Sequence, residues 1–561
     1  MTGLQECRSV SGVDALNHAL RNDALWTAAA FDYELGYALE PASGANGGAI
    51  DAAGPRARLW RFDTCRELDA TALEAWLSAQ LSALDSEALL AGVGGIGAEQ
   101  QQGDYLHGVE RIRHWIAAGD CYQVNFTFPL HFCHFGSPLA LYAKLREQQP
   151  VAYGGVLIEP DGAIVSLSPE LFLERRGRRV ITRPMKGTAP RAEDPEQLRL
   201  SAKNRAENLM IVDLLRNDLG RVADTGSVQV EALFAIEEYP TVWQMVSQVS
   251  ATVAPTVSTG EMLAALFPCG SVTGAPKIRA MQIINELEQS PRGLYTGAFG
   301  WLAPDGDFRL NVAIRTLELA RDGSGRMGVG SGIVADSDAA DEWQECWLKA
   351  AFLKRIDPGL KLIETLRCEQ GEVPLLPWHL RRISTSAAWL GFAYDPDKIR
   401  QAFADVPLEG VWRLRLTLDK PGAIELAIHP LDSLPPECRA EIARESIDSR
   451  HPLRRHKTTA RAQYDRALAE LTEKPEVFDR VFVNERGEVA EGARSNVFVE
   501  RDGVLLTPPL ASGALPGVLR AKLLAEGRAR EATLFLRDLE DGFLLGNALR
   551  GLVPVRLISG R

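Results

Sequence analysis

Two glutamates and a lysine beyond the middle of the chain are spaced so that they share one helix face. Glu342, Glu345 and Lys349 lie three and four residues apart, which puts their side chains on one stripe of an α-helix. The spacing alone is typical of a solvated face with an intrahelical ion pair. A second predicted helix carries Glu207, four residues after Lys203. Carboxylates from two helices can hold Mg²⁺, which prefers oxygen ligands and leaves positions for substrate and water.

An arginine and a glycine-rich loop could bind an anion. Arg315 follows a strand-like segment, and an arginine can hold a carboxylate with two hydrogen bonds, although an arginine there is more often a surface residue. The segment 270–277 reads Gly-Ser-Val-Thr-Gly-Ala-Pro-Lys. Its glycine spacing is wrong for a phosphate loop and Lys277 is followed by Ile, so we exclude a nucleotide site. With Pro276 near the first turn of a helix, the loop around Thr273 still offers free N–H groups to an anion.

The composition is that of a soluble protein with more than one domain. The chain has 561 residues, more than one hydrophobic core normally supports. A net charge of −12 argues against a general nucleic-acid or anionic-membrane surface. The eight cysteines form no C-x-x-C pair, and no apolar run approaches membrane-spanning length. We therefore expect a cytoplasmic enzyme that binds neither nucleic acid nor membrane.

A helical pattern that stops at a Pro-Gly pair marks the expected domain boundary. The residues 354–359 read Lys-Arg-Ile-Asp-Pro-Gly, and a strand-like pattern of residues resumes at Leu362. We place the two domains at 1–357 and 360–561. A weaker break in the charged segment 446–455 divides the second domain into a smaller and a larger lobe.

Seven segments in order resemble the family of anthranilate, isochorismate and aminodeoxychorismate synthases, across roughly residues 100–357. They are 167–172, 184–188, 203–218, 270–277, 314–316, 330–334 and 342–349. The resemblance implies an α+β fold with large antiparallel sheets, chorismate as substrate, and Mg²⁺ held by Glu207 and Glu345 with Glu342 close by. The substrate contacts that it implies come from Tyr295, Arg315, Lys349, Thr273 and the backbone of Gly330 and Gly332.

Lys186, in the segment Pro-Met-Lys-Gly-Thr, narrows the reaction. Relatives that make anthranilate or isochorismate typically have Ala at this position, whereas aminodeoxychorismate synthases typically have Lys. An amine of lowered pKa can act as a nucleophile. In the mechanism that the resemblance implies, Glu170 protonates the departing C4 hydroxyl and Lys186 adds at C2; ammonia then enters at C4 and expels the lysine. Glu170 must then be protonated at neutral pH, which burial can arrange.

The source of ammonia is not apparent in the chain. None of the eight cysteines lies in the Gly-x-Cys-x-Gly segment of a class I glutamine amidotransferase. The chain is therefore expected to take free ammonia or to receive it from a separate amidotransferase subunit.

Residues 360–561 resemble a second family, the class IV pyridoxal-phosphate enzymes, which includes branched-chain and D-amino-acid aminotransferases and aminodeoxychorismate lyases. The matching segments are 375–383, 456–464, 491–498, 513–520 and 547–551. The resemblance implies a two-lobed α/β domain in which Lys457 bonds the cofactor and Glu491 pairs with its pyridinium nitrogen. It also implies a dimer, since class IV relatives commonly complete their sites at a subunit interface. The cofactor phosphate would be held by Arg382, the backbone amides of Val518 and Leu519 at a helix start, and the segment of Asn547.

The reaction of this second domain is less sharply defined by its residues. Thr365 aligns with a threonine near the reacting atoms of the lyases, in which Lys457 would act as base and then as acid. Arg413 and Arg415 are candidates for binding substrate carboxylates, although the Gly-Arg-Gly segment of some lyases is absent. Fusion to the synthase favours a lyase.

The sequence therefore predicts a bifunctional enzyme that makes 4-aminobenzoate for folate. The first domain would convert chorismate and ammonia to 4-amino-4-deoxychorismate, and the second would release pyruvate from that product. Two alternatives stay open. One is an anthranilate synthase fused to a class IV aminotransferase, and the other is a degenerate binding module in one half.

Overall fold

The computed structural model describes residues 1–10, 13–20, 25–43, 57–239 and 242–558. The chain forms two compact units. Unit 1 comprises Met1–Ala83, Ile96–Phe132 and Leu141–Leu353, and unit 2 comprises Leu84–Gly95, Cys133–Ala140 and Lys354–Arg561. No helix in the described ranges is both long and apolar enough to cross a membrane.

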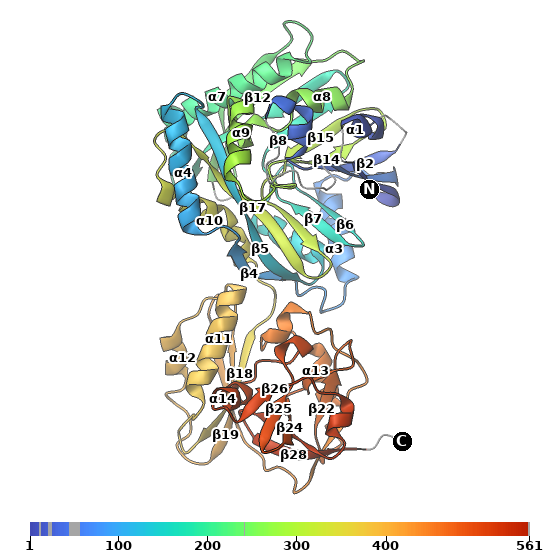
Figure 1. The fold of residues 1–561 in the computed structure, drawn as a ribbon, viewed down its shortest axis with the longest axis vertical. Coiled ribbons are helices and arrows are strands. Elements are labelled where there is room, and N and C mark those ends of the chain that lie inside the picture. The colour runs from blue at the N-terminus through green and yellow to red at the C-terminus, as the bar shows by residue number, and fades with distance from the viewer. Residues whose placement is uncertain (11–12, 21–24, 44–56, 240–241, 559–561) are drawn as a thin grey trace. The chain divides into compact units, whose positions relative to one another are not determined.

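Unit 1 is built on two antiparallel sheets (Figure 1). The first has the order β1 (Thr2–Val10), β3 (Ala57–Thr64), β2 (Trp26–Phe31), β14 (Ala298–Leu302), β15 (Phe308–Val312), β8 (Leu171–Arg176), β9 (Arg179–Arg183), β12 (Val242–Thr252), β10 (Met185–Pro190), with β11 (Gln229–Glu238) also on β12. The second has the order β13 (Gly274–Ala275), β5 (Gln123–Phe135), β17 (Ser324–Ile333), β16 (Thr316–Ala320), β7 (Gly162–Ser166), β6 (Gly155–Glu159), with β4 (Gly92–Ala98) also on β5.

Helices cover these sheets. They are α1 (Val13–Ala19), α2 (Leu35–Leu39), α3 (Ala70–Ser82), α4 (Gln102–Ala117), α5 (Pro138–Gln148), α6 (Pro195–Leu200), α7 (Ala202–Gly220), α8 (Thr259–Leu266), α9 (Lys277–Leu287) and α10 (Ala339–Arg355), with 3₁₀ turns η1 (Pro41–Ser43) and η2 (Gly270–Val272). Helix α7 buries Ile211, Leu215 and Leu219 in one core with Phe172 of β8. This i, i+4, i+8 stripe fixes the rotation of α7 about its axis, and so the direction of Glu207 on the same helix.

Helix α10 packs through an aromatic face that adjoins its acidic stripe. Trp343 stacks on Phe128 with ring centroids 4.9 Å apart, and Trp347 meets Trp343 edge-on. Ala350 is buried. The helix is thus held by one face, and its acidic stripe is set beside that face.

Unit 2 has two lobes. The smaller has an antiparallel sheet of β18 (Leu362–Glu369), β19 (Val411–Leu418) and β20 (Ile424–Pro430), with α11 (Leu376–Leu390) and α12 (Pro396–Ala402). The larger has the mixed order β23 (Val489–Gly492), β22 (Val477–Val483), β21 (Cys438–Ile442), β28 (Gly551–Leu557), β27 (Phe543–Asn547), β24 (Asn496–Arg501), β25 (Val504–Thr507), β26 (Ala529–Glu531). Its helices are α13 (Ala462–Ala469) and α14 (Val518–Ala525), with 3₁₀ turns η3 (Pro452–Arg455), η4 (Leu510–Ser512) and η5 (Leu536–Leu539).

Two segments from the first third of the chain belong to unit 2. Phe135, which is 4% exposed, joins the buried cluster of Leu360, Leu366 and Leu414 in the smaller lobe. Gly94 lies under Trp389, where a Cβ atom would stand 2.1 Å from the indole ring. The sequence carries no signal for this arrangement. The two compact units alternate along the sequence. The single domain boundary at 357/360 therefore stays a prediction.

Candidate active sites

Lys186 and Glu170 lie together in unit 1. Lys186 is on β10 at a register irregularity between Met185 and Thr188, beside Gly187 with φ +91°. Such an irregularity re-aims a side chain from an otherwise regular strand. Glu170 is 4% exposed and accepts a hydrogen bond from the Ser271 hydroxyl at 2.6 Å. The segments 167–172, 184–188 and 270–277, distant in sequence, therefore meet at one place.

Burial moves both groups toward their neutral forms. It raises the pKa of Glu170 above its usual value, with Ser271 and Lys186 acting against it. It lowers the pKa of Lys186, opposed by Glu170 and assisted by Lys349. A buried charge is costly without full compensation. The directions are those that a proton-donating carboxyl and a nucleophilic amine require.

The three glutamates predicted to bind metal are distributed over two helices. Glu207 of α7 and Glu345 of α10 both act electrostatically on Lys186, whereas Glu342 accepts a hydrogen bond from Ser337 at 2.6 Å. Within the described residues, no group of three or more His, Cys, Asp or Glu side chains forms a metal cluster. Two carboxylates suit Mg²⁺, because this ion is usually held by one or two carboxylates together with waters and substrate.

Lys349 links α10 to strand β17. Its Nζ lies 2.7 Å from Glu345 Oε1 and donates to Gly330 O at 2.8 Å. Gly330 has no room for a side chain, since a Cβ atom would stand 2.5 Å from the backbone oxygen of Phe126. At Gly332 a Cβ atom would stand 2.4 Å from the Gln123 side-chain amide, which would have to move. The role of both glycines at a substrate site stays a prediction.

Arg315, Tyr295 and Thr273 have local partners. Arg315 adopts φ +49°, unusual for a side-chain-bearing residue, and its guanidinium donates to Gln149 Oε1 at 3.3 Å. Its backbone oxygen accepts from Leu167 N at 3.0 Å, which ties it to the segment of Glu170. Thr273 is fully buried and donates to Cys269 O at 2.9 Å. Among the described residues, none of these three forms a hydrogen bond or ion pair with Lys186.

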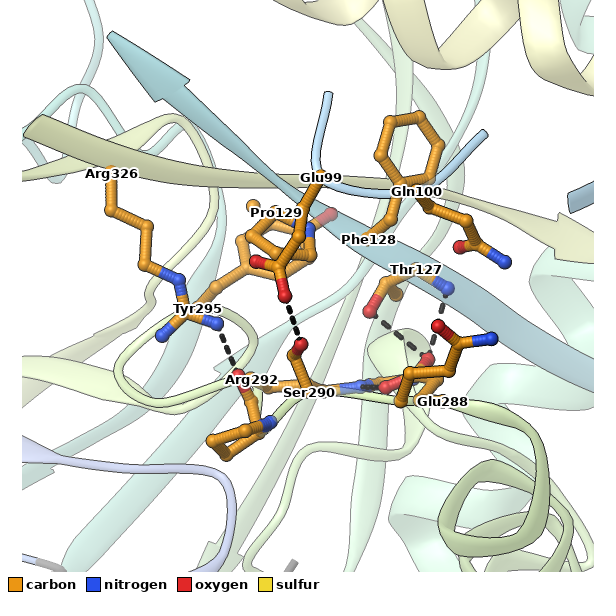
Figure 2. A pocket seen from close by; sticks show the side chains of 13 residues that line it. Glu99, Gln100, Thr127, Phe128, Pro129, Glu288, Ser290, Arg292, Tyr295 and Arg326 are labelled. Atoms are coloured by element: carbon orange, nitrogen blue, oxygen red, sulfur yellow. Dashed lines mark hydrogen bonds and ion pairs between the residues drawn. The ribbon is translucent and has the colours of Figure 1, made fainter. Parts of the chain in front are cut away.

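Tyr295 lines a surface pocket (Figure 2). Its other lining residues include Glu288 and Arg292, which form a buried ion pair at 2.8 Å. Arg292 also donates to Val272 O at 3.0 Å and to Asn125 O at 2.6 Å. This ion pair therefore fixes the loop of residues 270–273 against β5. The pocket lining, in the described part of the chain, includes neither Lys186 nor Glu170.

In unit 2, Lys457 stands between the two lobes' elements. Its backbone oxygen accepts from Ile363 N of β18 at 2.9 Å. Burial, with Arg461 and Arg382 nearby, lowers the pKa of Lys457 to about 7. Glu491 on β23 is 5% exposed and accepts hydrogen bonds from the Tyr464 hydroxyl and from Leu515 N at 2.9 Å. An amine that is partly neutral at pH 7 suits both bonding to a cofactor aldehyde and moving a proton.

Arg382 is held by a buried carboxylate. It donates from Nε to Glu364 Oε1 at 2.9 Å, and His379 Nδ1 lies 2.5 Å from the other oxygen. Burial alone raises the pKa of Glu364, but Arg382 and His379 outweigh it and hold the pKa at about 2. Arg382 also approaches Pro516 O at 3.5 Å. The arginine thus lies near the start of α14.

The N-terminus of α14 lies next to Arg382. Val518 and Leu519 begin the helix, and the preceding Gly517 has no room for a side chain, because a Cβ atom would stand 1.9 Å from Asn496 Oδ1. Free N–H groups at a helix start suit a phosphate. Asn547 donates to Arg494 O at 3.1 Å, and Thr365 lies on β18 opposite Arg415. The donor set fits pyridoxal phosphate, because Arg382 and Glu491 both act electrostatically on Lys457.

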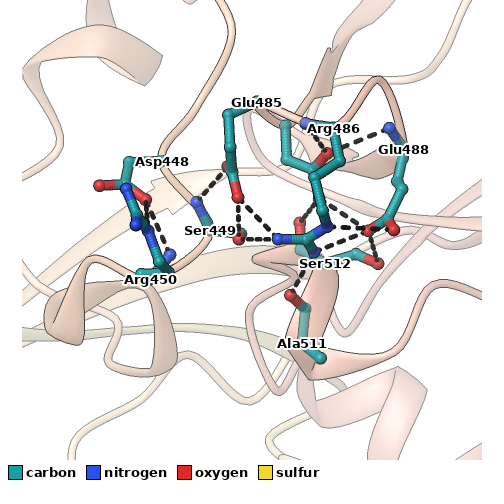
Figure 3. Close-up of polar contacts among 9 residues, drawn as sticks. Asp448, Ser449, Arg450, Glu485, Arg486, Glu488, Ala511 and Ser512 are labelled. Atoms are coloured by element: carbon teal, nitrogen blue, oxygen red, sulfur yellow. Dashed lines mark hydrogen bonds and ion pairs between the residues drawn. The ribbon is translucent and has the colours of Figure 1, made fainter. Parts of the chain in front are cut away.

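A polar cluster braces the segment before α14 (Figure 3). Arg486 donates to Ala511 O at 2.9 Å and to Glu488 at 2.8 Å, and Ser512 donates to the same carboxylate at 2.8 Å. These contacts tie the β22–β23 turn to η4. Glu491 and Leu515, which share a hydrogen bond, come shortly after Glu488 and Ser512 in the sequence.

Sequence reasoning missed several residues that contact the predicted ones. Ser271 bonds Glu170, Tyr464 bonds Glu491, and Glu364 holds Arg382. Ser271 and Tyr464 lie inside the segments that carry the resemblance. Their hydroxyl groups could have indicated that they bond the predicted carboxylates. Glu364 could have been noticed only as an acidic residue at a core position of a strand.

Comparison with protein families divides the chain into two parts. Residues 10–355 match the family described as chorismate binding enzyme, and residues 361–558 match amino-transferase class IV. The chain belongs to the chorismate binding enzyme family, because that match covers more than half of it. Its remaining part carries the class IV match.

Individual relatives agree with the first assignment. Aminodeoxychorismate synthase component 1 of Klebsiella aerogenes is 40% identical over 288 residues, which are 50% of this chain and 63% of the relative. Aminodeoxychorismate synthase component 1 of Escherichia coli (strain K12) is 40% identical over 297 residues, 52% and 65% respectively. Anthranilate synthase component 1 of Thermus thermophilus is 43% identical over 261 residues, 45% and 56% respectively. The chain spans less than two thirds of the length of these relatives.

A solved structure supports the fold. Anthranilate synthase component I from Streptococcus pneumoniae TIGR4 has a TM-score of 0.52 at 27% identity, covering 61% of this chain and 85% of its own. The predicted fold class is confirmed: an α+β chorismate-binding part with large antiparallel sheets is followed by a two-lobed class IV part.

Proposed function

We propose that this protein makes 4-aminobenzoate in two steps. Unit 1 converts chorismate and ammonia to 4-amino-4-deoxychorismate, and unit 2 releases pyruvate from that product. The observation that carries the first assignment is the pairing of Lys186 with Glu170, both shifted by burial toward the neutral form. Two of the relatives named above are called aminodeoxychorismate synthase component 1.

In the first step, Glu170 gives its proton to the C4 hydroxyl of chorismate, which leaves as water, while Lys186 Nζ bonds to C2. Ammonia then bonds to C4, the C2–N bond to Lys186 breaks, and the proton that ammonia loses returns to Glu170. Glu207 and Glu345 would hold Mg²⁺, which supplies positive charge for a substrate carboxylate when bound. Arg315, Tyr295, Lys349, Thr273 and the Gly330 and Gly332 backbone are proposed to position the substrate.

In the second step, Lys457 and Glu491 are the central residues. Lys457 takes a proton from the carbon that bears the amino group and returns one to the departing three-carbon unit, which leaves as pyruvate. Glu491 and the Arg382–Glu364 pair would hold pyridoxal phosphate, which supplies an electron sink when bound. Thr365 is proposed to lie near the reacting atoms. Aromatisation of the ring drives this release.

The name component 1 of the relatives supports a separate glutamine amidotransferase as the ammonia source. A dimer through unit 2 and a cytoplasmic location remain predictions. A pull-down with a glutaminase subunit and a sedimentation measurement would test the first two.

One assay tests the whole proposal. The purified chain is supplied with chorismate, ammonium, Mg²⁺ and pyridoxal phosphate, and 4-aminobenzoate, anthranilate and pyruvate are measured separately. Formation of 4-aminobenzoate with an equal amount of pyruvate is expected. Anthranilate as the product would favour the rival enzyme that the Thermus thermophilus relative represents. The absence of a visible cofactor absorption band would make the second half a binding module.

A further inference from the structure

One face of the small sheet in unit 2 carries arginines. In the β18–β19 pairing, Arg367 lies opposite Arg413, and Thr365 lies opposite Arg415. Residues two apart on a strand share a face. Leu362, Leu366 and Cys368 alternate with them and are buried in the core of the small lobe. The face with Thr365 and the arginines is therefore the one turned away from that core.

Two arginines of the large lobe approach the same place. Asn547 Oδ1 accepts from Arg550 N at 2.9 Å, and Asn547 Nδ2 donates to Arg494 O at 3.1 Å. Arg550 thus lies in the segment predicted to close the cofactor phosphate site, and the backbone of Arg494 is bonded to that segment. The Arg494 guanidinium donates from Nε to Phe478 O at 3.1 Å. The Arg550 guanidinium donates to the Asp432 backbone oxygen, and Leu431 N donates to Val411 O at 3.1 Å, so Arg550 lies beside the strand that carries Arg413. Burial and the charges of Arg494, Arg367 and Arg413 lower the pKa of Arg550. We call Arg367, Arg413, Arg494 and Arg550 the four-arginine cluster.

In the described part of the chain, three acids lie beside these four arginines. Glu369 pairs with Arg367 at 3.1 Å, Asp432 attracts Arg550, and the buried Asp479 lies beside Arg494. Burial raises the pKa of Asp479 toward its neutral form, so the arginines keep an excess positive potential. Guanidinium groups bind carboxylates with paired hydrogen bonds. The excess attracts a ligand that carries carboxylates.

We infer that the four-arginine cluster binds the two carboxylates of a dianionic substrate beside the residues proposed to hold pyridoxal phosphate. The inference deepens the proposed function and rests on it for the identity of the substrate, 4-amino-4-deoxychorismate. The cluster takes the place of the Gly-Arg-Gly segment that the sequence lacks. Its role differs from that of Arg382, which is committed to Glu364 and the phosphate end.

The test uses the full chain loaded with pyridoxal phosphate and purified 4-amino-4-deoxychorismate. Arg413→Gln and Arg550→Gln should each raise the KM for pyruvate release about tenfold or more, because a hydrogen bond to a charged group contributes roughly 1.5–3 kcal/mol. We expect a smaller change in kcat and an unchanged cofactor absorption band. Arg413→Lys should fall between wild type and Arg413→Gln. Arg400→Gln is the control, since Arg400 is exposed on α12 and pairs with Asp397 at 2.6 Å.

A second measurement does not depend on turnover. Isophthalate, a non-reacting dicarboxylate, is titrated while the cofactor absorption band of unit 2 is followed. Weaker isophthalate binding in Arg413→Gln, but not in Arg400→Gln, supports the cluster even if wild type releases no pyruvate, an outcome that would overturn only the proposed function. An unchanged KM and unchanged isophthalate affinity in Arg413→Gln would overturn the inference. Arg413 is exposed on its strand, so this variant is expected to fold even if Arg550→Gln does not.

Discussion

Replacing Glu364 with Gln is expected to lower both the stability of unit 2 and its affinity for pyridoxal phosphate. The side chain is 3% exposed and is shared between Arg382 and His379. The fall of its pKa from 4.5 to about 2 corresponds to roughly 3 kcal/mol, since one pKa unit is ~1.4 kcal/mol. Removing one member of a buried pair costs about 3–5 kcal/mol. The two estimates agree.

The same shift fixes the pH dependence. Because the pKa of Glu364 is depressed in the folded protein, its stabilising contribution is complete above about pH 4.5 and is lost as the pH falls toward 2. Glu364→Gln lacks this contribution at every pH. The difference in stability between wild type and variant should therefore be largest near neutral pH and shrink below about pH 4.5.

Urea unfolding followed by the cofactor absorption band, and titration of the apoprotein with pyridoxal phosphate, measure the two effects. Glu425→Gln is the matched control, because Glu425 is 71% exposed and pairs with Lys361 at 2.9 Å on the same sheet. A surface pair of this kind contributes about 0–1 kcal/mol. If Glu364→Gln unfolds and binds cofactor as Glu425→Gln does, Glu364 does not hold Arg382 for the phosphate.

Five further substitutions test the two units separately. Lys186→Ala should abolish most ammonia-dependent aminodeoxychorismate formation and leave pyruvate release intact; an unchanged synthase rate would exclude covalent catalysis. Glu207→Gln and Glu345→Gln should each raise the Mg²⁺ concentration for half-maximal synthase activity, because a neutral ligand replaces an anionic one; the same metal titration in both variants as in wild type would leave them as surface residues. Lys457→Ala should lose the cofactor band and all pyruvate release while aminodeoxychorismate accumulates, and continued 4-aminobenzoate formation would contradict the assignment. Phe135→Ala should destabilise unit 2 by roughly 3–5 kcal/mol, seen as earlier loss of the cofactor band on heating, and loss of synthase activity alone would refute its place in that core.

The sequence predicted the fold class because its segments combine distinctive residues with fixed spacing, whereas the roles of the residues in those segments stay predictions. Glycines show the clearest physical reason. Gly330 was predicted at the substrate site, and a Cβ atom there would stand 2.5 Å from the backbone oxygen of Phe126. Lys186 could be singled out only through its neighbours, since a lysine in a strand has no intrinsic signature.

Contacts across the chain could not be predicted in this way. The Ser271 hydroxyl reaches Glu170 over a separation of 101 residues, and its direction depends on how the loop meets the sheet. Glu364 occupies an inward position of β18, where an apolar residue would be expected. Its charge is acceptable only because α11 brings His379 and Arg382 to the same side, which no local pattern reveals.

The membership of residues 84–95 and 133–140 in unit 2 has a consequence for biosynthesis. These segments leave the ribosome before residue 354, where the main part of unit 2 begins. At ~5–20 residues per second, their partners follow about ten seconds or more later. Phe135 and Leu90 therefore lack the rest of their hydrophobic core until the main part of unit 2 has been synthesised. The nascent chain is most exposed to aggregation and most dependent on chaperones during that interval, and premature termination within it would leave an apolar surface that nothing later covers.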